Sequence, residues 1–147
     1  MTDIERFVAI EEIKQLKARY FRCVDTKDWG GFAALFAADA TVDYTPPGGN
    51  PKDWSMSGAA NITAFVRKAL EGAVTVHHGH MPEIEITSPT TATGIWAMED
   101  LLWARKGAPV PFKTLHAFGH YHETYEKRDG AWVIKTIRLS RLRVDVT

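Results

Sequence analysis

The sequence has one cysteine and no excess of charge of either sign. Cys23 has no partner in the chain, so an internal disulfide is excluded and a reducing compartment is the simplest expectation. Lys and Arg together number 18, as do Asp and Glu, so the formal net charge is zero. Surfaces that follow a phosphate backbone carry an excess of basic residues, so nucleic acid is not expected as a partner.

Long apolar runs are also missing, and no leader segment is expected. No apolar stretch is long enough to cross a bilayer. Residues 1–5 are acidic and amphipathic, whereas a signal peptide begins with basic residues and continues with an apolar segment. We therefore expect a cytoplasmic protein without a membrane partner.

The motifs that bind common cofactors are absent as well. The sequence contains no glycine-rich phosphate loop, no GxSxG nucleophile motif, and no HExxH or CxxC motif. His120 and His122 place two imidazoles on one strand face, but they lack the further ligands that a zinc site needs. We expect neither a metal nor any other cofactor.

What the sequence does contain is the composition of an ordinary globular domain. Hydrophobic residues make up 45% of the 147 residues and charged residues 24%, which predicts a single domain, residues 1–147. An apolar stripe at intervals of three and four residues predicts a long first helix over residues 3–24. The stripe consists of Ile10, Ile13, Leu16, Tyr20 and Val24. Lys17 is expected on the solvent side of this helix.

Shorter elements are predicted after the first helix. Asp28 is expected to cap a helix over residues 28–37, and a short strand follows over residues 41–44. Residues 45–57 are rich in proline and glycine and are expected to form a loop that folds over a site as a lid. A further helix is predicted from residue 58 or 61 to residue 70.

Strands dominate the rest of the chain. They are predicted over residues 74–86, 91–105, 112–127 and 132–144. Gly79 and Pro82 are expected to mark a bulge or a sheet edge, and Asp129 with Gly130 predicts a hairpin turn. Helices followed by an antiparallel meander predict an α+β fold, with the helices packed on one face of one sheet.

Two charged residues interrupt apolar strand faces. Asp100 falls on a face formed otherwise by Ala92, Gly94, Trp96, Met98, Leu102 and Ala104. A buried carboxylate must be paired, hydrogen-bonded or protonated. Arg141 follows Ile137 and Leu139 on the last strand, but Lys135 and Arg143 share its alternation, so a solvated edge is equally consistent.

The pattern leaves the meaning of these residues open. Asp100 and Arg141 can form a buried salt bridge without chemistry, or belong to a site of apolar rings and a few converging charges. Tyr20 and Asp25, near the end of the first helix, are consistent with a core tyrosine and a capping carboxylate, or with a phenol and a carboxylate delivered to a site.

Three blocks of sequence resemble the SnoaL-like family of the nuclear transport factor 2-like superfamily. They are IEEIKQLKARYFRCVD (residues 10–25), HHGHMPEIEITSPTTATGIWAMED (residues 77–100) and YEKRDGAW (residues 125–132). Within the family the resemblance is to bile-acid 7α-dehydratase and, more distantly, to scytalone dehydratase. Residues 45–57 and 106–111 do not match the bile-acid enzyme, so the resemblance leaves the substrate open.

The resemblance implies a fold and a site. The fold is a cone-shaped, strongly curved antiparallel sheet of the cystatin-like type, wrapped around the N-terminal helices, with a deep apolar pocket. The expected catalytic residues are Tyr20, Asp25, His77, Asp100 and Arg141, which match those that line the pocket of the bile-acid enzyme. The residues expected to bind substrate are Trp96, Met98, His80 and His116.

The function implied is that of a cofactor-independent dehydratase, a lyase, or of an isomerase. His77 is expected to act as general base, Asp25 to orient it, and Tyr20 to hydrogen-bond the leaving hydroxyl or an enolate. The expected substrate is a small apolar cyclic molecule, steroid-like or aromatic polyketide-like. A non-catalytic binding module and a structural assembly protein are the alternatives.

Self-association is expected from the outer face of the sheet. Trp103 and Phe118 fall opposite the inward faces that carry Asp100 and Tyr121, and the net charge is zero. A sheet covered by helices on one side leaves such rings exposed unless a partner covers them. The resemblance favours a dimer or a trimer, with the trimer suggested by the dehydratases.

Overall fold

The structure is a computed structural model that describes all residues from Met1 to Thr147. Its first element is the long helix α1 (Asp3–Asp25), and Thr2 and Glu5 close a reciprocal capping box at its start. The prediction of a helix over residues 3–24 is confirmed. None of the helices combines the length and the apolar character needed to span a membrane.

Three short helices follow, α2 (Trp29–Ala33), α3 (Pro51–Trp54) and α4 (Ala59–Leu70). Asp28 caps α2 as predicted, but the predicted end at residue 37 is wrong because β1 (Phe36–Asp43) begins at Phe36. The prediction of an unbroken loop over residues 45–57 is also wrong, since this segment contains α3 and β2 (Ser55–Ser57). Asn50 caps α3 and Pro51 occupies its first turn, and this pair is a local helix-start signal within the proline-rich segment.

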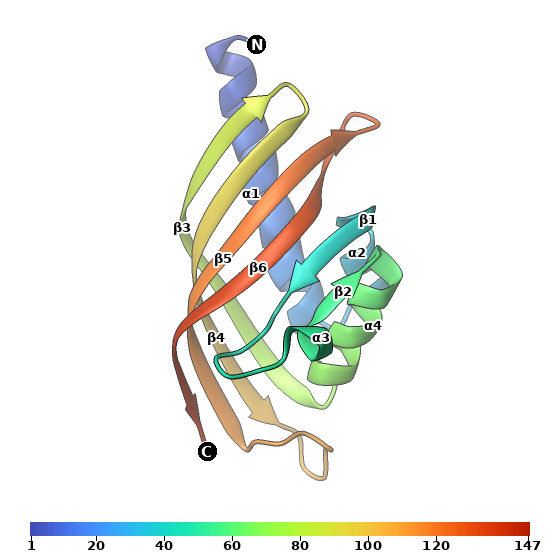
Figure 1. The fold of residues 1–147 in the computed structure, drawn as a ribbon, viewed down its shortest axis with the longest axis vertical. Helices are drawn as coiled ribbons and strands as arrows, with labels where there is room; N and C mark the ends of the chain where they lie inside the picture. The colour runs from blue at the N-terminus through green and yellow to red at the C-terminus, as the bar shows by residue number, and fades with distance from the viewer.

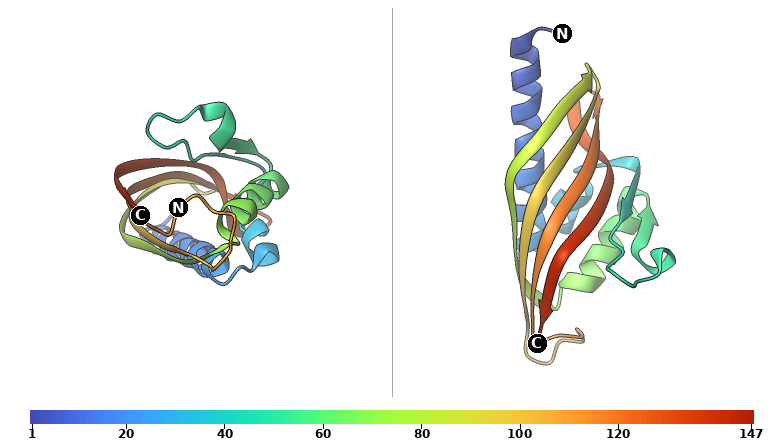
Figure 2. Two further views of the ribbon diagram at one scale, coloured as in Figure 1. Left: turned by 90° about the horizontal axis from the view of Figure 1, so that it is seen from below. Right: turned by 60° about the vertical axis from the view of Figure 1, so that its left-hand side comes forward.

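Four long strands build most of the sheet: β3 (Ala73–Ser88), β4 (Thr91–Ala104), β5 (Thr114–Arg128) and β6 (Ala131–Val146). The strand order is β2-β1-β6-β5-β4-β3, and the four long strands pair antiparallel as predicted. β1 instead runs parallel to β6, which the sequence did not predict. The sheet curves around one side of the molecule, and α1, α2 and α4 lie along the other (Figures 1 and 2).

Breaks in register occur in several strands of the sheet. On the edge strand β3 the register shifts between Gly79 and Pro82, which confirms the break predicted there. A Cβ at Gly79 would lie 2.6 Å from the Phe21 ring, so the glycine lets α1 approach the sheet. The strong curvature of the sheet is consistent with such bulges, because each one bends its strand and increases the local twist.

β6 carries two more bulges, and they decide where Arg141 points. The register shifts at Lys135 and again at Leu142, so Lys135 and Arg143 leave the face on which Arg141 lies. The predicted shared alternation is therefore wrong. At the second bulge β6 passes so close to β5 that a Cβ at Gly119 would lie 2.8 Å from Cα of Arg141. A glycine is therefore required opposite this bulge.

Lys17 is buried, which corrects the expectation that it faces solvent. Its ammonium pairs with Glu123, and both side chains are 0% exposed. The ammonium also lies 3.6 Å from the ring centroid of Tyr121 and 4.0 Å from that of Tyr20. The curved sheet covers a wider part of α1 than an apolar stripe alone indicates, and burial lowers the pKa of Lys17 although Glu123 opposes this.

The ion pair continues into a buried hydrogen-bond network. The hydroxyl of Tyr125 donates to Glu123, and Trp96 Nε1 donates to the Tyr125 hydroxyl at 2.9 Å. These groups lie within the main apolar core, which includes Ile13, Leu16, Phe32, Ile62 and Ile134. Each carboxylate oxygen of Glu123 thus has a donor, which is the condition for tolerating a buried charge.

Removal of one half of this ion pair should be costly. Lys17→Met leaves the Glu123 carboxylate buried without its cation, and it is expected to lower the free energy of unfolding by about 3–5 kcal/mol. The double variant Lys17→Met/Glu123→Gln removes both charges, so its free energy of unfolding should fall markedly less. Urea unfolding measures both, with Lys14→Met on the exposed side of α1 as control. Equal losses in the single and double variants would contradict this.

The outer face of the sheet should drive self-association. Val74, Ile95 and Trp103 are 45%, 38% and 42% exposed there, and no helix covers them. We expect light scattering at micromolar concentration to report a dimer or trimer, and Trp103→Glu to shift the population toward monomer. A monomeric parent protein at this concentration would refute the expectation.

Candidate active site

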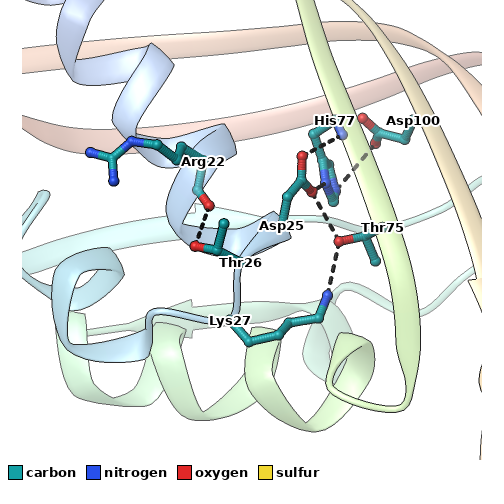
Figure 3. A network of polar contacts seen from close by, with 7 residues as sticks. All are labelled: Arg22, Asp25, Thr26, Lys27, Thr75, His77 and Asp100. Carbon is teal, nitrogen blue, oxygen red and sulfur yellow. Dashed lines mark hydrogen bonds and ion pairs between the residues drawn. The ribbon is translucent and has the colours of Figure 1, made fainter.

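Asp25 and His77 form a dyad between the end of α1 and the edge strand β3. Asp25 Oδ1 lies 2.6 Å from His77 Nδ1, and Asp25 Oδ2 accepts the backbone N–H of His77 at 2.9 Å (Figure 3). The same carboxylate therefore fixes both the strand and the imidazole. Since α1 ends at Asp25, the helix terminus aims this side chain at β3.

The electrostatics of Asp25 determine which nitrogen of His77 is free. Burial by itself would raise the pKa of Asp25, but hydrogen bonds from His77 and Thr75 and the charge of His77 outweigh it and lower the pKa. An ionised carboxylate accepts hydrogen bonds only, so Nδ1 of His77 carries the proton. In the neutral imidazole the lone pair then lies on Nε2, on the side of Asp100.

Asp100 faces His77 from the neighbouring strand. The two residues are register partners across β3 and β4, and Asp100 Oδ2 lies 4.0 Å from His77 Nε2. Asp100 is 7% exposed and its Oδ1 has no hydrogen-bond partner. Burial raises its pKa, and the charges of His77 and Lys17 only partly oppose this. No ion pair joins Asp100 to Arg141, so a structural salt bridge between them is not present.

A cavity of about 350 Å³ opens in front of these groups. Tyr20, His77, Asp100 and Arg141 line it, while Asp25 lies behind His77. Most of the remaining wall is apolar and includes Val24, Trp54, Phe65, Leu102, Phe112 and Leu115. The structure thus brings all five of the residues predicted to be catalytic to one place, four on the wall and one behind it.

A second polar cluster lies on the cavity wall. The hydroxyls of Tyr20 and Tyr44 are 3.0 Å apart, and Arg141 donates to the backbone carbonyl of Tyr44 at 3.0 Å. Burial raises the pKa of both phenols, so they stay neutral donors. Burial lowers the pKa of Arg141, but a guanidinium remains protonated at any ordinary pH. This wall therefore presents hydrogen-bond donors and one positive charge.

Sequence reasoning missed several polar residues at the site. Tyr44 and Tyr121 line the cavity, and Thr75 donates to Asp25 Oδ1 at 2.9 Å. Tyr121 lies on the same alternation of β5 as the buried Ala117 and Glu123. That alternation, a polar group on an inward face, was the signal that singled out Asp100 and would also have found Tyr121.

The four residues predicted to bind substrate do not line the cavity. Trp96 and Met98 point inward but lie farther along β4 in the main core, where Trp96 bonds to Tyr125. His80 and His116 lie on the other side of the sheet, with Nε2 atoms 3.7 Å and 2.7 Å from the Glu99 carboxylate. His116 precedes the cavity residue Ala117, so strand alternation turns it outward.

Nowhere in the structure do three His, Cys, Asp or Glu side chains gather in an arrangement that would hold a metal ion. The side chains around the cavity form a set with a chemistry of its own. It comprises one oriented imidazole, two carboxylates in different environments, three neutral phenols and a guanidinium. Such a set can transfer a proton and stabilise a developing negative charge on oxygen.

Comparisons with known proteins agree with this architecture. Among solved structures, a putative scytalone dehydratase from Novosphingobium aromaticivorans superposes with a TM-score of 0.84 at 21% identity, covering 99% of this chain and 92% of that one. The hexachlorocyclohexane dehydrochlorinase LinA-type3 from Novosphingobium barchaimii has a TM-score of 0.80 at 19% identity, covering 99% and 94%. These likenesses show that the chain shares the fold of these two proteins.

The sequence itself also has matches. "Probable cyclase FGR4" from Gibberella zeae is 26% identical over 137 residues, which cover 88% of this chain and 89% of that protein. The family model of the SnoaL-like domain matches residues 5–138, nearly the whole chain. The protein therefore belongs to the SnoaL-like domain family.

Proposed function

We propose that the protein is a cofactor-independent dehydratase or isomerase that acts on a small apolar cyclic substrate. One observation carries the proposal: His77, held by Asp25 through Nδ1, faces an apolar cavity that also contains Tyr20, Asp100 and Arg141. Two of the similar solved structures are named as a dehydratase and a dehydrochlorinase, and both names denote eliminations. A shared fold with them is consistent with the proposal.

The first step is removal of a proton from a carbon next to a carbonyl group. Nε2 of His77 takes the proton, and the electron pair of the C–H bond moves to the carbonyl oxygen, forming an enolate. The carboxylate of Asp25 stabilises the imidazolium that results. One of the hydroxyls of Tyr20 and Tyr44 donates to the other, so the phenol proton that remains and the Arg141 guanidinium would stabilise the enolate oxygen.

The second step returns the proton. In a dehydration the imidazolium of His77 gives it to the leaving hydroxyl, the C–O bond breaks, a carbon–carbon double bond forms and water departs. In an isomerisation the proton goes to another carbon. Asp100, with Oδ2 4.0 Å from Nε2, is placed to hydrogen-bond the leaving hydroxyl beside His77.

The cavity indicates the substrate class. A volume of about 350 Å³ is at the small end of the range for sites that enclose organic ligands, and the wall is mostly apolar. Arg141 has no carboxylate partner within ion-pair distance, so a polar or anionic oxygen on the substrate is its natural partner. We propose a cyclic ketone or phenol, of the steroid or aromatic polyketide type, with one such oxygen.

Loss of the dyad should abolish most of the turnover. His77→Ala removes the base and is expected to lower kcat/KM by about 10²–10⁴-fold. Tyr20→Phe retains the ring but deletes a donor, so a loss of about 10²-fold with little change in stability is expected. Asp25→Asn should also lower the rate, and the three effects should be strongly non-additive because the groups act as one unit.

The assay is mass spectrometry of the loss of water, or chromatography of isomers, for hydroxy-ketones and hydroxy-phenols first found to bind by thermal shift. His78→Ala is the matched control, because His78 is the next residue on β3 and does not line the cavity. If the parent leaves every bound candidate unchanged while the variants only weaken binding, the enzyme proposal fails and the binding module takes its place.

Asp100 is expected to lower the stability of the folded protein at neutral and alkaline pH. The pKa of Asp100 is raised in the folded state by burial. As pH rises Asp100 must ionise while buried, and this destabilises the folded state relative to the unfolded state. Asp100→Asn is therefore expected to raise the melting temperature at pH 8 more than at pH 4, because at pH 4 the folded-state carboxyl, whose pKa is raised, has less need to ionise while buried. Thermal unfolding at both pH values checks this, with exposed Asp53→Asn as control. A gain independent of pH would contradict it.

A further inference from the structure

A chain of four polar groups leads from the protein surface to the cavity. Lys27 Nζ lies 2.9 Å from Thr75 Oγ1, which lies 2.9 Å from Asp25 Oδ1, and this oxygen lies 2.6 Å from His77 Nδ1 (Figure 3). Thr75 is buried and Lys27 is half-buried. The mechanism proposed above uses Asp25 and His77 but assigns no role to Lys27 or Thr75.

The direction of every hydrogen bond in this chain is fixed. An ammonium has donors only, so the Thr75 oxygen must accept from Lys27. The single hydroxyl proton of Thr75 is then available for Asp25, which as a carboxylate can only accept. Without Lys27 the hydroxyl would be free to rotate and to bond water instead.

Lys27 occupies a backbone position that normally suits glycine. Asp28 N–H donates to the Cys23 carbonyl and Lys27 N–H to the Val24 carbonyl, the pattern of a Schellman motif that ends α1. The residue at the left-handed position of this motif is usually glycine, but here Lys27 adopts it with φ of 59°. A lysine is strained in this conformation, and its side chain turns back to the site.

We propose that Lys27 and Thr75 are positioning residues that keep Asp25 in its ionised, accepting state and so hold His77 as a neutral base with its proton on Nδ1. Two carboxylates, Asp25 and Asp100, flank the imidazole and favour its protonated form, which cannot remove a proton. The ammonium and the hydroxyl act against this by withdrawing negative charge from Asp25. The inference rests on the proposed function only for its effect on the rate.

Other charges near Lys27 do not replace it. Glu71 and Arg105 also influence Lys27, with opposite signs. Around His77 itself the charged groups are Asp25 and Asp100, and Arg141 and Lys17 act on Asp100. Lys27 is thus the cation that reaches the dyad through a hydrogen bond, by way of Thr75.

The test is an NMR titration of the ligand-free protein with isotopically labelled histidine side chains, which reports both tautomer and protonation of His77. Thr75→Val removes the hydroxyl at nearly equal volume, and Lys27→Gly removes the ammonium while suiting the left-handed backbone. Each is expected to move the midpoint of the His77 titration upward by about 0.5 pH unit. The double variant should shift by less than the sum, because Lys27 acts through Thr75.

Two controls separate positioning from packing. Thr75→Ser restores the hydroxyl and should titrate like the parent. Thr26→Ala removes a neighbouring hydroxyl that bonds only to the Arg22 carbonyl, at 2.7 Å, and should have no effect. Lys27→Gly should melt at the parent temperature or above, since it removes backbone strain. An unshifted His77 in folded Thr75→Val and Lys27→Gly, or a Thr75→Ser protein that behaves like Thr75→Val, overturns the proposal.

Kinetics then distinguish this inference from the proposed function. On the acid side of the pH profile, kcat/KM of Thr75→Val and Lys27→Gly should fall about threefold, the factor that a shift of 0.5 pH unit implies, with little change on the alkaline plateau. A shifted NMR titration without any turnover would sustain the role of Lys27 and Thr75 and refute the enzyme. Turnover with an unshifted NMR titration would sustain the proposed enzyme and refute the role of Lys27 and Thr75.

Discussion

The contact of Asp25 with His77 joins the two halves of the fold. The carboxylate ends the only long helix and bonds both the backbone and the imidazole of an edge strand, so it anchors β3 where no further strand can. An edge strand has unpaired backbone groups, and here the N–H of His77 is satisfied by a side chain. The interaction that stabilises the sheet edge is therefore also the one that orients the candidate base. Structure and chemistry cannot be separated at this point.

Several ionisable side chains are buried in the protein interior near the cavity. Lys17 and Glu123 pair beneath the rings of Tyr20 and Tyr121, and Asp100 stands beside His77 with one oxygen unsatisfied. Lys17 and Glu123 have hydrogen-bond partners within the protein, whereas Oδ1 of Asp100 has none. An apolar core would serve the fold at least as well as these groups do. Asp100 lines the cavity, and Lys17 lies against Tyr20 and Tyr121, which also line it; this pattern is expected of a site rather than of a scaffold.

The sequence was most informative where local pattern and tertiary structure agree. The periodicity of α1, the hairpin turn at Asp129 and the interrupted face at Asp100 all follow from neighbours a few residues away. The helix pattern singled out Tyr20 and Asp25 but could not distinguish a site from a core, and His77 was found only through the family resemblance. These residues come together at the cavity only in the folded chain, so their proximity cannot be read from local sequence.

The errors have physical causes that sequence pattern does not reveal. Strict alternation fails on β6, since each bulge reverses the inward and outward faces and Lys135 and Arg143 leave the side of Arg141. Burial of Lys17 depends on how far the sheet wraps around α1. Trp96 and Met98 share the inward face of Asp100 but not its position along the strand, so face alone did not place them at the cavity.

The close approach at Gly119 makes Arg141 dependent on a residue without a side chain. β6 can bulge at Leu142 only while position 119 offers no Cβ, and this bulge turns Arg141 toward the cavity and Arg143 away from it. A larger residue at position 119 would therefore remove the bulge, and the side chain at position 141 would no longer be held toward the cavity. Gly119 does not line the cavity, although it determines the orientation of Arg141, the only cation on the cavity wall.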